Sequence, residues 1–521
     1  MSRFTKIENY IHRFRYIPRR SSLIFLFCII IFSWIYEYQE ILFLSPQGIH
    51  QWRQCDCLSF TMNYYQDNNP FLKPALHFLG KDGTGRTISE FPILYYLTGK
   101  LWKIFGPHEY IYRMINLLIF FSGLFALFRL LENILKDSIW AILIPFLLFT
   151  SPVLAFYANN FLTNSTALGL SLIAWYVFWL YFKKGRSLHL YLAILIFTLA
   201  GLLKITASIN LIALFIIFLF ELLRLFTFRN NHKLFPQPIT HVIPFLIAFA
   251  LIFIWYLYVQ SYNFKHNAGG FLVGILPIWD LEKDQVSAVI QSLELQLKQS
   301  YFRPVTYYFL LLAFAATLIF LKNANTFLVI LQCLFICGIF LFGILFFSPL
   351  MYHDYYILNL YVVVPAICLS FLVMLRKRFP GLFKSSLISI AMIVFVIHNL
   401  DFANRRMRDR YSGWMNENYT KYMHSFENIS PYLRSIGIEK SDKVICLPDE
   451  SLNISLYFMN QKGWTQMWIQ SDSSQMRKTI DMGADYLIIY DETVYEEDFI
   501  QPFIINMIGE FDNIDIYSLT D

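Results

Sequence analysis

Long apolar segments recur along this sequence and limit what it can fold into. The first runs from Ser22 to Leu44, and at about 1.5 Å per residue it is long enough to cross a hydrocarbon core of about 30 Å. Ten more follow near residues 110–131, 139–157, 163–182, 188–203, 207–226, 239–259, 305–321, 326–347, 356–375 and 384–399. Only 15% of the residues are charged, against about a quarter in soluble domains. We therefore expect an all-α polytopic membrane protein with about eleven transmembrane helices.

Basic residues indicate how these helices are oriented. Residues 1–22 are rich in Lys and Arg, and the basic clusters at 183–186, 224–233 and 376–378 fall in loops that alternate to the cytoplasmic side. This pattern predicts a cytoplasmic N-terminus at 1–22 and a transmembrane domain at 23–399, in a bacterial plasma membrane. A further cluster, Arg405 to Arg410, follows the last apolar segment on the predicted outer side, so the orientation of that segment stays open.

Residues 400–521 return to the composition of a soluble domain. Their pattern predicts a strand at Lys443–Leu447, a helix at Leu452–Asn460, a helix at Ser474–Met482 and a strand at Tyr486–Tyr490. We expect a small α/β extracytoplasmic domain. The basic charge of the chain belongs to the apolar part and fits cytoplasmic loops, and it does not indicate a nucleic-acid partner.

The outer loop at 45–109 holds the densest candidate chemistry. Asp56 lies near its start, before a predicted helical stretch, and Glu90 precedes a semi-apolar run that ends at Gly106. At about 14 residues that run is too short to span a bilayer, so we expect an amphipathic helix along the interface. The loop would then hold both carboxylates near the headgroups, where a lipid-borne reactive group lies.

Several candidates have a structural alternative beside the functional one. Asp56 could pair with Arg53 or Lys100 simply to organise the loop. Lys204, at the outer end of a helix, would meet an anion there or extend to the bilayer surface. Cys55 and Cys57 flank Asp56, but the sequence around them lacks the paired Cys/His spacing of a metal site.

A series of short motifs falls on the predicted outer face. They are Trp52-Arg53-Gln54 with Asp56, Glu90-Phe91-Pro92 leading to Gly106, Arg113 and Asn116, Ser151-Pro152 with Tyr157 and Leu162-Thr163-Asn164, Gly201-Leu202-Leu203-Lys204, and His353-Asp354-Tyr355-Tyr356. In their order they resemble the membrane glycosyltransferases of the C superfamily. The similar branch contains the aminoarabinose transferase of lipid A, the rhizobial galacturonosyltransferases and the protein O-mannosyltransferases, and the resemblance covers about residues 20–375.

The resemblance implies roles for two residues. Asp56 would act as the base on the acceptor, and Lys204 would contact the carrier phosphate. The family commonly has an acid where this chain has Asn164, which puts a second carboxylate in doubt, together with any metal that it would help hold. No cofactor is assigned, and a divalent metal stays open.

Chemical reasoning adds supporting roles. We expect Arg53, Arg113 and His353 to help stabilise charge on the departing phosphate, and Glu90 to orient the acceptor or Arg53. Trp52, Tyr355 and Asn164 are candidate substrate contacts.

The donor follows from the predicted topology. Sugar nucleotides are charged and cytoplasmic, so an outward-facing site needs a sugar carried across on a lipid, such as a polyprenyl phosphate. The sequence has no GxGxxG, P-loop or Asp-x-Asp motif for a nucleotide. We therefore expect transfer with inversion to a hydroxyl of a lipid, glycan or protein.

Two other functions remain open on the sequence alone. A transporter or flippase of lipid-linked sugars would place charges mid-membrane, whereas these helices are almost free of acidic residues. A glycan polymerase or ligase that uses a lipid diphosphate is close in chemistry.

Overall fold

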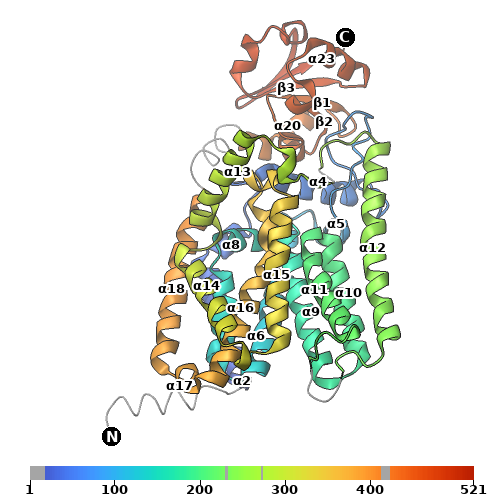
Figure 1. Cartoon of the computed structure of the whole chain (residues 1–521). Coiled ribbons are helices and arrows are strands. Elements are labelled where there is room, and N and C mark those ends of the chain that lie inside the picture. Colours follow the sequence, from blue (N-terminus) through green and yellow to red (C-terminus); the bar gives the residue numbers. More distant parts are fainter. Residues whose placement is uncertain (1–17, 229–232, 272–273, 412–422, 521) are drawn as a thin grey trace. The chain divides into compact units, whose positions relative to one another are not determined.

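The computed structural model describes residues 18–228, 233–271, 274–411 and 423–520. The chain divides into two compact units (Figure 1). The first unit comprises Met1–Leu42, Met114–Ile254 and Gly274–Arg408, and the second comprises Phe43–Arg113, Trp255–Val273 and Asp409–Asp521. Most of the predicted cytoplasmic N-terminus, and Arg229 of a predicted basic loop, lie outside the described residues.

Each predicted apolar segment is helical in the structure. Seven helices of the described residues are long and apolar enough to cross a membrane, namely α6 (Glu109–Leu135), α9 (Asn164–Lys184), η1 with α11 (Ile205–Ala207, Ser208–Leu222), α12 (Pro238–Lys265), α15 (Thr326–Leu345), η6 with α16 (Asp354–Val362, Val363–Arg378) and α18 (Ser386–Asp409). Two further pairs qualify together but are bent, α7 (Ser138–Phe149) with α8 (Pro152–Ala158) by 84°, and α13 (Lys283–Gln296) and η3 (Leu297–Tyr301) with α14 (Pro304–Ile319) by 94°. The apolar helices α2 (Pro18–Ile35) and α10 (Ser187–Leu203) are shorter. The chain is thus a polytopic membrane protein, and the number of eleven crossings stays a prediction.

The first helix ends earlier than its apolar run. α2 stops at Ile35, and Glu37 adopts the left-handed conformation with φ of 57° before the short helix α3 (Tyr38–Ile41). The hydroxyls of Tyr36 and Tyr38 donate to the carbonyls of Phe149 and Ala155, at 2.8 and 2.5 Å, around the bend between α7 and α8. The polar residues Glu37, Gln39 and Glu40 lie at this break, inside the run that we expected to be one helix.

The last apolar helix runs further than predicted. α18 continues to Asp409 and so carries most of the arginine cluster that follows the apolar segment. Arg405 pairs with Asp401 one turn earlier at 2.6 Å, and Arg408 pairs with Glu37. These ion pairs neutralise part of the basic charge for which the orientation of the last apolar segment was left open.

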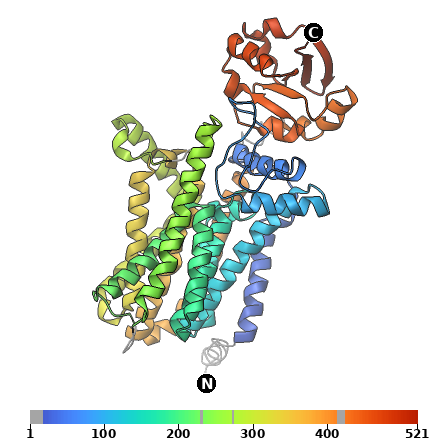
Figure 2. The same cartoon turned by 90° about the vertical axis from the view of Figure 1, so that its right-hand side faces the viewer.

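Small residues allow close packing of the long helices in the first unit. α9 packs along α10, and α14 and α15 pack against α16 (Figure 1, Figure 2). Where α6 crosses α9, a Cβ atom on Gly123 would lie 2.5 Å from the Cα of Gly169. The two backbones approach so closely only because both positions lack a side chain.

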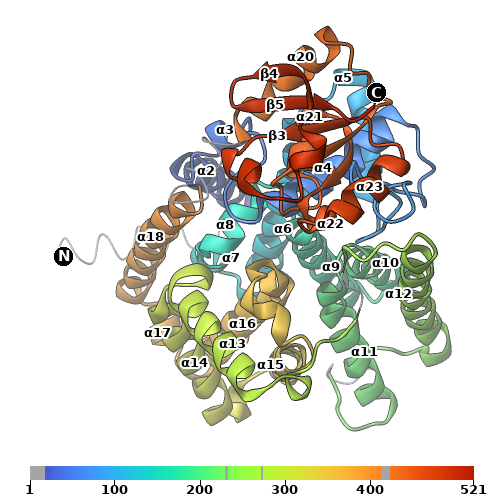
Figure 3. The same ribbon diagram turned by 90° about the horizontal axis from the view of Figure 1, so that it is seen from above.

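The second unit contains a five-stranded sheet of order β2-β1-β3-β5-β4. The strands are β1 (Lys443–Leu447), β2 (Lys462–Thr465), β3 (Tyr486–Ile489), β4 (Asn506–Phe511) and β5 (Ile514–Ser518). β1 pairs in parallel with β2 and β3. β5 lies between β3 and β4 and is antiparallel to both (Figure 3). The helices α20 (Ile429–Ser435), α21 (Ile454–Met459), α22 (Gln466–Ile469) and α23 (Ser473–Asp481) complete the predicted α/β fold.

The first loop contributes two helices to this unit, α4 (Gln51–Gln66) and α5 (Ile93–Phe105). α5 is the predicted amphipathic helix, with one buried face formed by Leu94, Tyr95, Thr98, Gly99 and Trp102. That face packs on α4, where a Cβ on Gly99 would lie 2.9 Å from the Cβ of Tyr64. Its position along the membrane interface stays a prediction.

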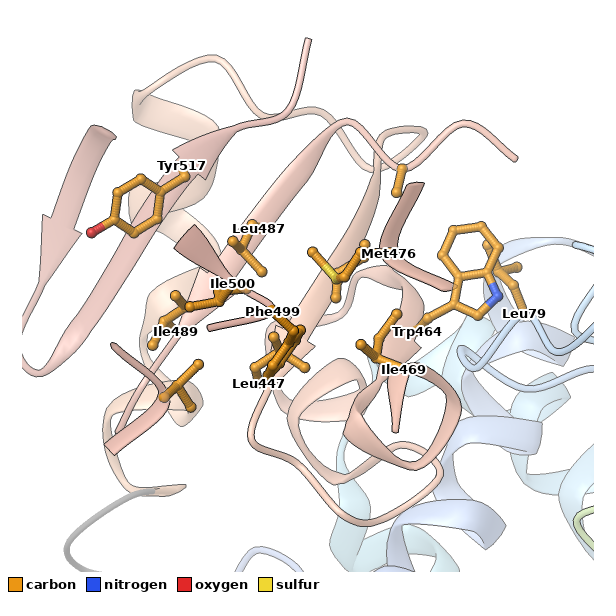
Figure 4. Packing of buried hydrophobic residues seen from close by; sticks show 13 residues of the cluster. Leu79, Leu447, Trp464, Ile469, Met476, Leu487, Ile489, Phe499, Ile500 and Tyr517 are labelled. Carbon is orange, nitrogen blue, oxygen red and sulfur yellow. The ribbon is translucent and has the colours of Figure 1, made fainter. Parts of the chain in front are cut away.

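The first loop also adds a segment to the edge of the sheet. Gly463 of β2 donates its N–H to the carbonyl of His77 at 3.1 Å and accepts from the N–H of Leu79 at 2.9 Å. Leu79 then inserts into the core with Trp464, Ile469 and Met476 (Figure 4). The outer loop and the C-terminal residues therefore belong to the same compact unit.

Gly463 gives a test of this arrangement. A Cβ at this position would lie 1.8 Å from the carbonyl oxygen of Val444, so Gly463→Ala forces β2 away from β1. We expect destabilisation of about 3 kcal/mol or more, measured as a fall in the unfolding temperature of the purified protein. Gly269→Ala, which meets no atom within 4 Å, is the control and should leave that temperature unchanged. Equal stability of the two variants would contradict the strand pairing.

Candidate functional site

A buried group of charges lies at the start of α4. His50, in a left-handed conformation with φ of 57°, directly precedes the helix. Arg53 and Asp56 lie three residues apart within it, and so fall on the same face about one turn apart. Arg53 Nη1 lies 3.3 Å from Asp56 Oδ2, and its Nη2 lies 2.6 Å from Glu90 Oε2. The guanidinium thus bridges the two carboxylates that the sequence singled out.

Asn453 also binds Asp56. Its Nδ2 donates to Asp56 Oδ1 at 2.7 Å, across 397 residues of sequence, and both side chains are almost completely buried. Sequence reasoning missed this residue. The signal that could have indicated it is its place in the polar loop after β1, because ligand-binding groups gather outside the carboxyl ends of parallel strands where the strand order reverses.

The loop after β1 is held rigidly by Asp449. This carboxylate accepts from the backbone N–H groups of Ser451 and Ser455, at 2.8 and 2.9 Å, and from the Ser455 hydroxyl at 2.6 Å. Asn453 lies between these two serines, as the residue that precedes α21. Its amide is therefore fixed in place before it meets Asp56.

Burial sets the acidity of Asp56. Desolvation favours the neutral acid, while the charge of Arg53 and the hydrogen bonds from Arg53 and Asn453 favour the carboxylate. The balance raises the pKa of Asp56 to about 7. A carboxyl group with such a pKa can accept a proton at neutral pH far better than an ordinary, more acidic one.

Glu90 is surrounded by donors. Besides Arg53, the hydroxyl of Tyr95 donates to Glu90 Oε2 at 2.8 Å, and so does the hydroxyl of the adjacent Ser89. The Arg53 guanidinium also lies 5.0 Å from the ring centroid of Phe271. Glu90 therefore pairs with Arg53, which is the contact that one of its two predicted roles requires, and both roles stay predictions.

The sequence also allowed Asp56 to pair with Arg53 or Lys100 only to organise the loop, and one of these two pairs forms. The Arg53–Asp56 ion pair exists, whereas Lys100 lies 5.0 Å from the ring centroid of Tyr96. Loop organisation and chemistry are compatible here, because the same arginine that orders the loop also tunes the carboxylate.

These side chains do not fit a metal ion. The space between Asp56 and Glu90 holds the Arg53 guanidinium, and burial raises the pKa of the Cys57 thiol to about 12, which keeps it protonated. Across residues 18–228, 233–271, 274–411 and 423–520, no three His, Cys, Asp or Glu side chains gather as metal ligands would.

A second group of predicted residues meets in the first unit. Lys204 ends α10, and its Nζ lies 5.8 Å from the ring centroid of Tyr355. Asn164 Nδ2 donates to the Tyr355 carbonyl at 2.8 Å, and the Tyr355 hydroxyl lies 3.3 Å from His353 Nδ1. Three residues named from the sequence, Lys204, Asn164 and His353, thus come together around a fourth, Tyr355.

The backbone that carries Tyr355 is unusual. η6 continues as a 3₁₀-helix for nine residues, and such runs rarely exceed four. Its first residue, Asp354, is buried and accepts from the Tyr157 hydroxyl at 2.9 Å. Asp354 is a carboxylate that sequence reasoning quoted within a motif but gave no role.

The remaining predicted residues have other contacts. Arg113 Nη1 donates to the Leu44 carbonyl at 2.5 Å, and Trp52 packs edge-on to His50 with ring centroids 6.2 Å apart. Because Asp56 and Lys204 belong to different units, the prediction that they share one site stays a prediction.

Comparison with solved structures identifies the fold. No family model and no curated protein matches the sequence. ArnT from Cupriavidus metallidurans, bound to undecaprenyl phosphate, is similar over 94% of this chain and 98% of its own, with a TM-score of 0.58 and 10% identity. The chain has the fold of the C-superfamily membrane glycosyltransferases.

Two other C-superfamily structures agree. The archaeal oligosaccharyltransferase AglB from Archaeoglobus fulgidus, in complex with an inhibitory peptide and a dolichol-phosphate, matches 89% of this chain and 69% of its own, with a TM-score of 0.50 and 13% identity. The arabinofuranosyltransferase AftD from Mycobacteria matches 97% of this chain but 40% of its own, with a TM-score of 0.55 and 11% identity. The resemblance predicted from the motifs is confirmed at the level of the fold.

The contact between Asn453 and Asp56 can be tested by chemical labelling. An apolar carbodiimide modifies protonated carboxyl groups, so labelling of Asp56 should fall as pH rises through about 7. Asn453→Leu removes a hydrogen bond that favours the charged form, and should move the midpoint up by about one pH unit. Mass spectrometry of the labelled peptide measures the midpoint. The exposed Asn506→Leu is the control; equal midpoints in the two variants would show that Asn453 does not act on Asp56.

Proposed function

We propose that this protein transfers a sugar from a polyprenyl-phosphate-linked donor to a hydroxyl group of an acceptor at the outer face of the membrane, with inversion. The observation that carries the proposal is the buried carboxylate of Asp56, held by Arg53 and Asn453 in a chain with the C-superfamily fold. Its pKa of about 7 suits a base that works near neutral pH.

A lipid-linked donor is supported by two lines of argument. ArnT was solved with undecaprenyl phosphate and AglB with a dolichol-phosphate, so two proteins of this fold bind polyprenyl phosphates. The present sequence has no nucleotide-binding motif. Both favour a sugar delivered on a polyprenyl phosphate.

In the proposed step, Asp56 takes the proton of the acceptor hydroxyl. The acceptor oxygen forms a bond to the anomeric carbon, while the bond from that carbon to the phosphate oxygen breaks and its electron pair leaves with the polyprenyl phosphate. Attack from the face opposite the leaving group inverts the anomeric centre. Because the phosphate is a good leaving group, one carboxylate suffices for the proton transfer.

Lys204 is the proposed partner of the carrier phosphate. Its cation lies over the face of Tyr355, and His353 binds the hydroxyl of the same tyrosine. Charge that develops on the phosphate would be stabilised by this lysine, with His353 and Arg113 in support. Asn164, Tyr355 and Trp52 remain the proposed sugar contacts.

Arg53 has a different proposed role from that predicted from the sequence. Both of its terminal nitrogens are engaged by carboxylates, Nη1 by Asp56 and Nη2 by Glu90. We propose that it positions and tunes Asp56 and does not itself bind the donor phosphate.

The proposed setting follows the predicted topology. We place the protein in a bacterial plasma membrane, with residues 1–22 cytoplasmic, a transmembrane domain at 23–399 with its catalytic loop at 45–109, and an extracytoplasmic domain at 400–521. The acceptor is a lipid, glycan or protein. A transporter would move a labelled lipid-linked sugar without a transfer product, and a diphosphate-dependent polymerase would release a polyprenyl diphosphate.

Asp56→Asn tests the base. The amide cannot accept the proton, so we expect transfer of a radiolabelled sugar to fall about 100-fold or more, while the variant still reaches the membrane. Wild-type activity should rise with pH through about 7 as Asp56 loses its proton. Asp67→Asn, which removes an exposed ion pair with Lys462, is the control and should retain activity. Undiminished transfer by Asp56→Asn would refute the mechanism.

Lys204→Gln tests the phosphate contact. Loss of the cation should lower kcat/KM for the lipid donor by about 10- to 100-fold and weaken inhibition by free undecaprenyl phosphate to a similar extent. The matched control is Lys183→Gln, an exposed lysine at the end of α9. If undecaprenyl phosphate inhibits both variants equally, Lys204 does not bind the carrier.

A further inference from the structure

A cavity of about 500 Å³ lies within the second unit, outside the group formed by Arg53, Asp56 and Glu90. Its walls come from the first loop at 76–87, the segment 266–271 after α12, and the C-terminal residues at 452 and 467–478. Neither the sequence motifs nor the proposed chemistry assigned this cavity a role.

The cavity has an excess of available positive charge. Lys81, Arg86 and Lys478 line it, and within the described part of the chain none of these three forms an ion pair. Its two acids are engaged: Asp82 Oδ2 lies 2.8 Å from His266 Nδ1, and Asp472 accepts from the backbone N–H of Ser474 at 2.8 Å. The three cations outnumber the two carboxylates, and they are the groups left to pair with an anion that enters.

Apolar surface lies beside these charges. The indole of Trp468 and the ring of Phe271 line the cavity, together with Met467. The N–H of Trp468 donates to the Thr479 hydroxyl at 3.0 Å, which fixes the plane of the indole. A fixed aromatic ring beside cationic groups suits a sugar ring that carries negative charge, because the apolar face of the sugar stacks while its charged group pairs.

The cavity shares its wall with the surroundings of Asp56. Phe271, which lines it, lies 5.0 Å from the Arg53 guanidinium by its ring centroid. Leu452, which also lines the cavity, directly precedes Asn453, which donates to Asp56. A molecule held in the cavity therefore touches Phe271, which contacts Arg53, and Leu452, which is the neighbour of Asn453. Arg53 and Asn453 are the two residues that bind the proposed base, Asp56.

We infer that this cavity binds the acceptor, and that the acceptor is a saccharide bearing carboxylate or phosphate groups. That the bound molecule is the acceptor rests on the proposed function. That the cavity binds an anionic saccharide is a separate claim, which can be measured without sugar transfer. The cations hold the negative groups of the chain, and Trp468 supports a neighbouring ring.

The test measures binding by the full-length protein in detergent. The probes are a hexasaccharide of galacturonic acid, phosphorylated maltohexaose and neutral maltohexaose, each with the same fluorophore. We expect at least one anionic probe to bind about tenfold more tightly than the neutral one. Whether the galacturonic acid probe or the phosphorylated probe binds more tightly shows whether the site prefers carboxylate or phosphate groups. The double variant Arg86→Gln/Lys478→Gln should lose about tenfold in affinity for that probe.

Arg477→Gln is the matched control, because Arg477 is the neighbour of Lys478 on α23 and does not line the cavity. It should bind as the wild type does, and an unchanged unfolding temperature in all variants excludes misfolding. Equal binding of neutral and anionic probes, or unchanged binding by the double variant, would overturn the inference. Asp56→Asn separates the two proposals, because this variant should still bind the anionic probe. If the wild-type protein binds the probe but transfers no sugar from any lipid-linked donor, the binding site is supported and the proposed function is refuted.

Discussion

The backbone pairing of His77–Leu79 with Gly463 connects the outer loop to the C-terminal sheet, and the proposed chemistry depends on it. One segment of the loop forms a β-bridge with the edge strand β2, and Leu79 enters the core of the α/β fold. This pairing keeps α4 and the loop after β1 in one compact unit, so that Asn453 can reach Asp56. A C-terminal domain tethered only by its linker could not hold a hydrogen bond of 2.7 Å to a buried carboxylate.

The raised pKa of Asp56 depends on the fact that its partner Arg53 also binds a second carboxylate, Glu90. An arginine that served Asp56 alone would favour the carboxylate strongly and make it a poor base. Here Arg53 also binds Glu90, at a shorter distance than it binds Asp56, and the remaining support for Asp56 is the neutral amide of Asn453. Burial can therefore outweigh these interactions and bring the pKa to about 7.

Much of the architecture could be predicted because it depends on local patterns. The apolar segments, the amphipathic helix α5, and strand β1 each follow from periodicity within a short window. Strands β2, β4 and β5 could not be predicted in this way. β2 contains Gly463, which local propensity disfavours in a strand, and which the sheet requires because the carbonyl of Val444 approaches too closely for any side chain.

The sequence by itself determined that this is a polytopic membrane protein, and it singled out Arg53, Asp56 and Glu90, because composition, hydropathy and short motifs are properties of neighbouring residues. Only the tertiary structure decided how these groups interact. It placed Arg53 between two carboxylates, brought Asn453 to Asp56 across 397 residues, and put Asp354 beside Tyr157. Such contacts arise from the packing of distant segments, and no pattern along the chain encodes which distant side chain will complete a buried polar group.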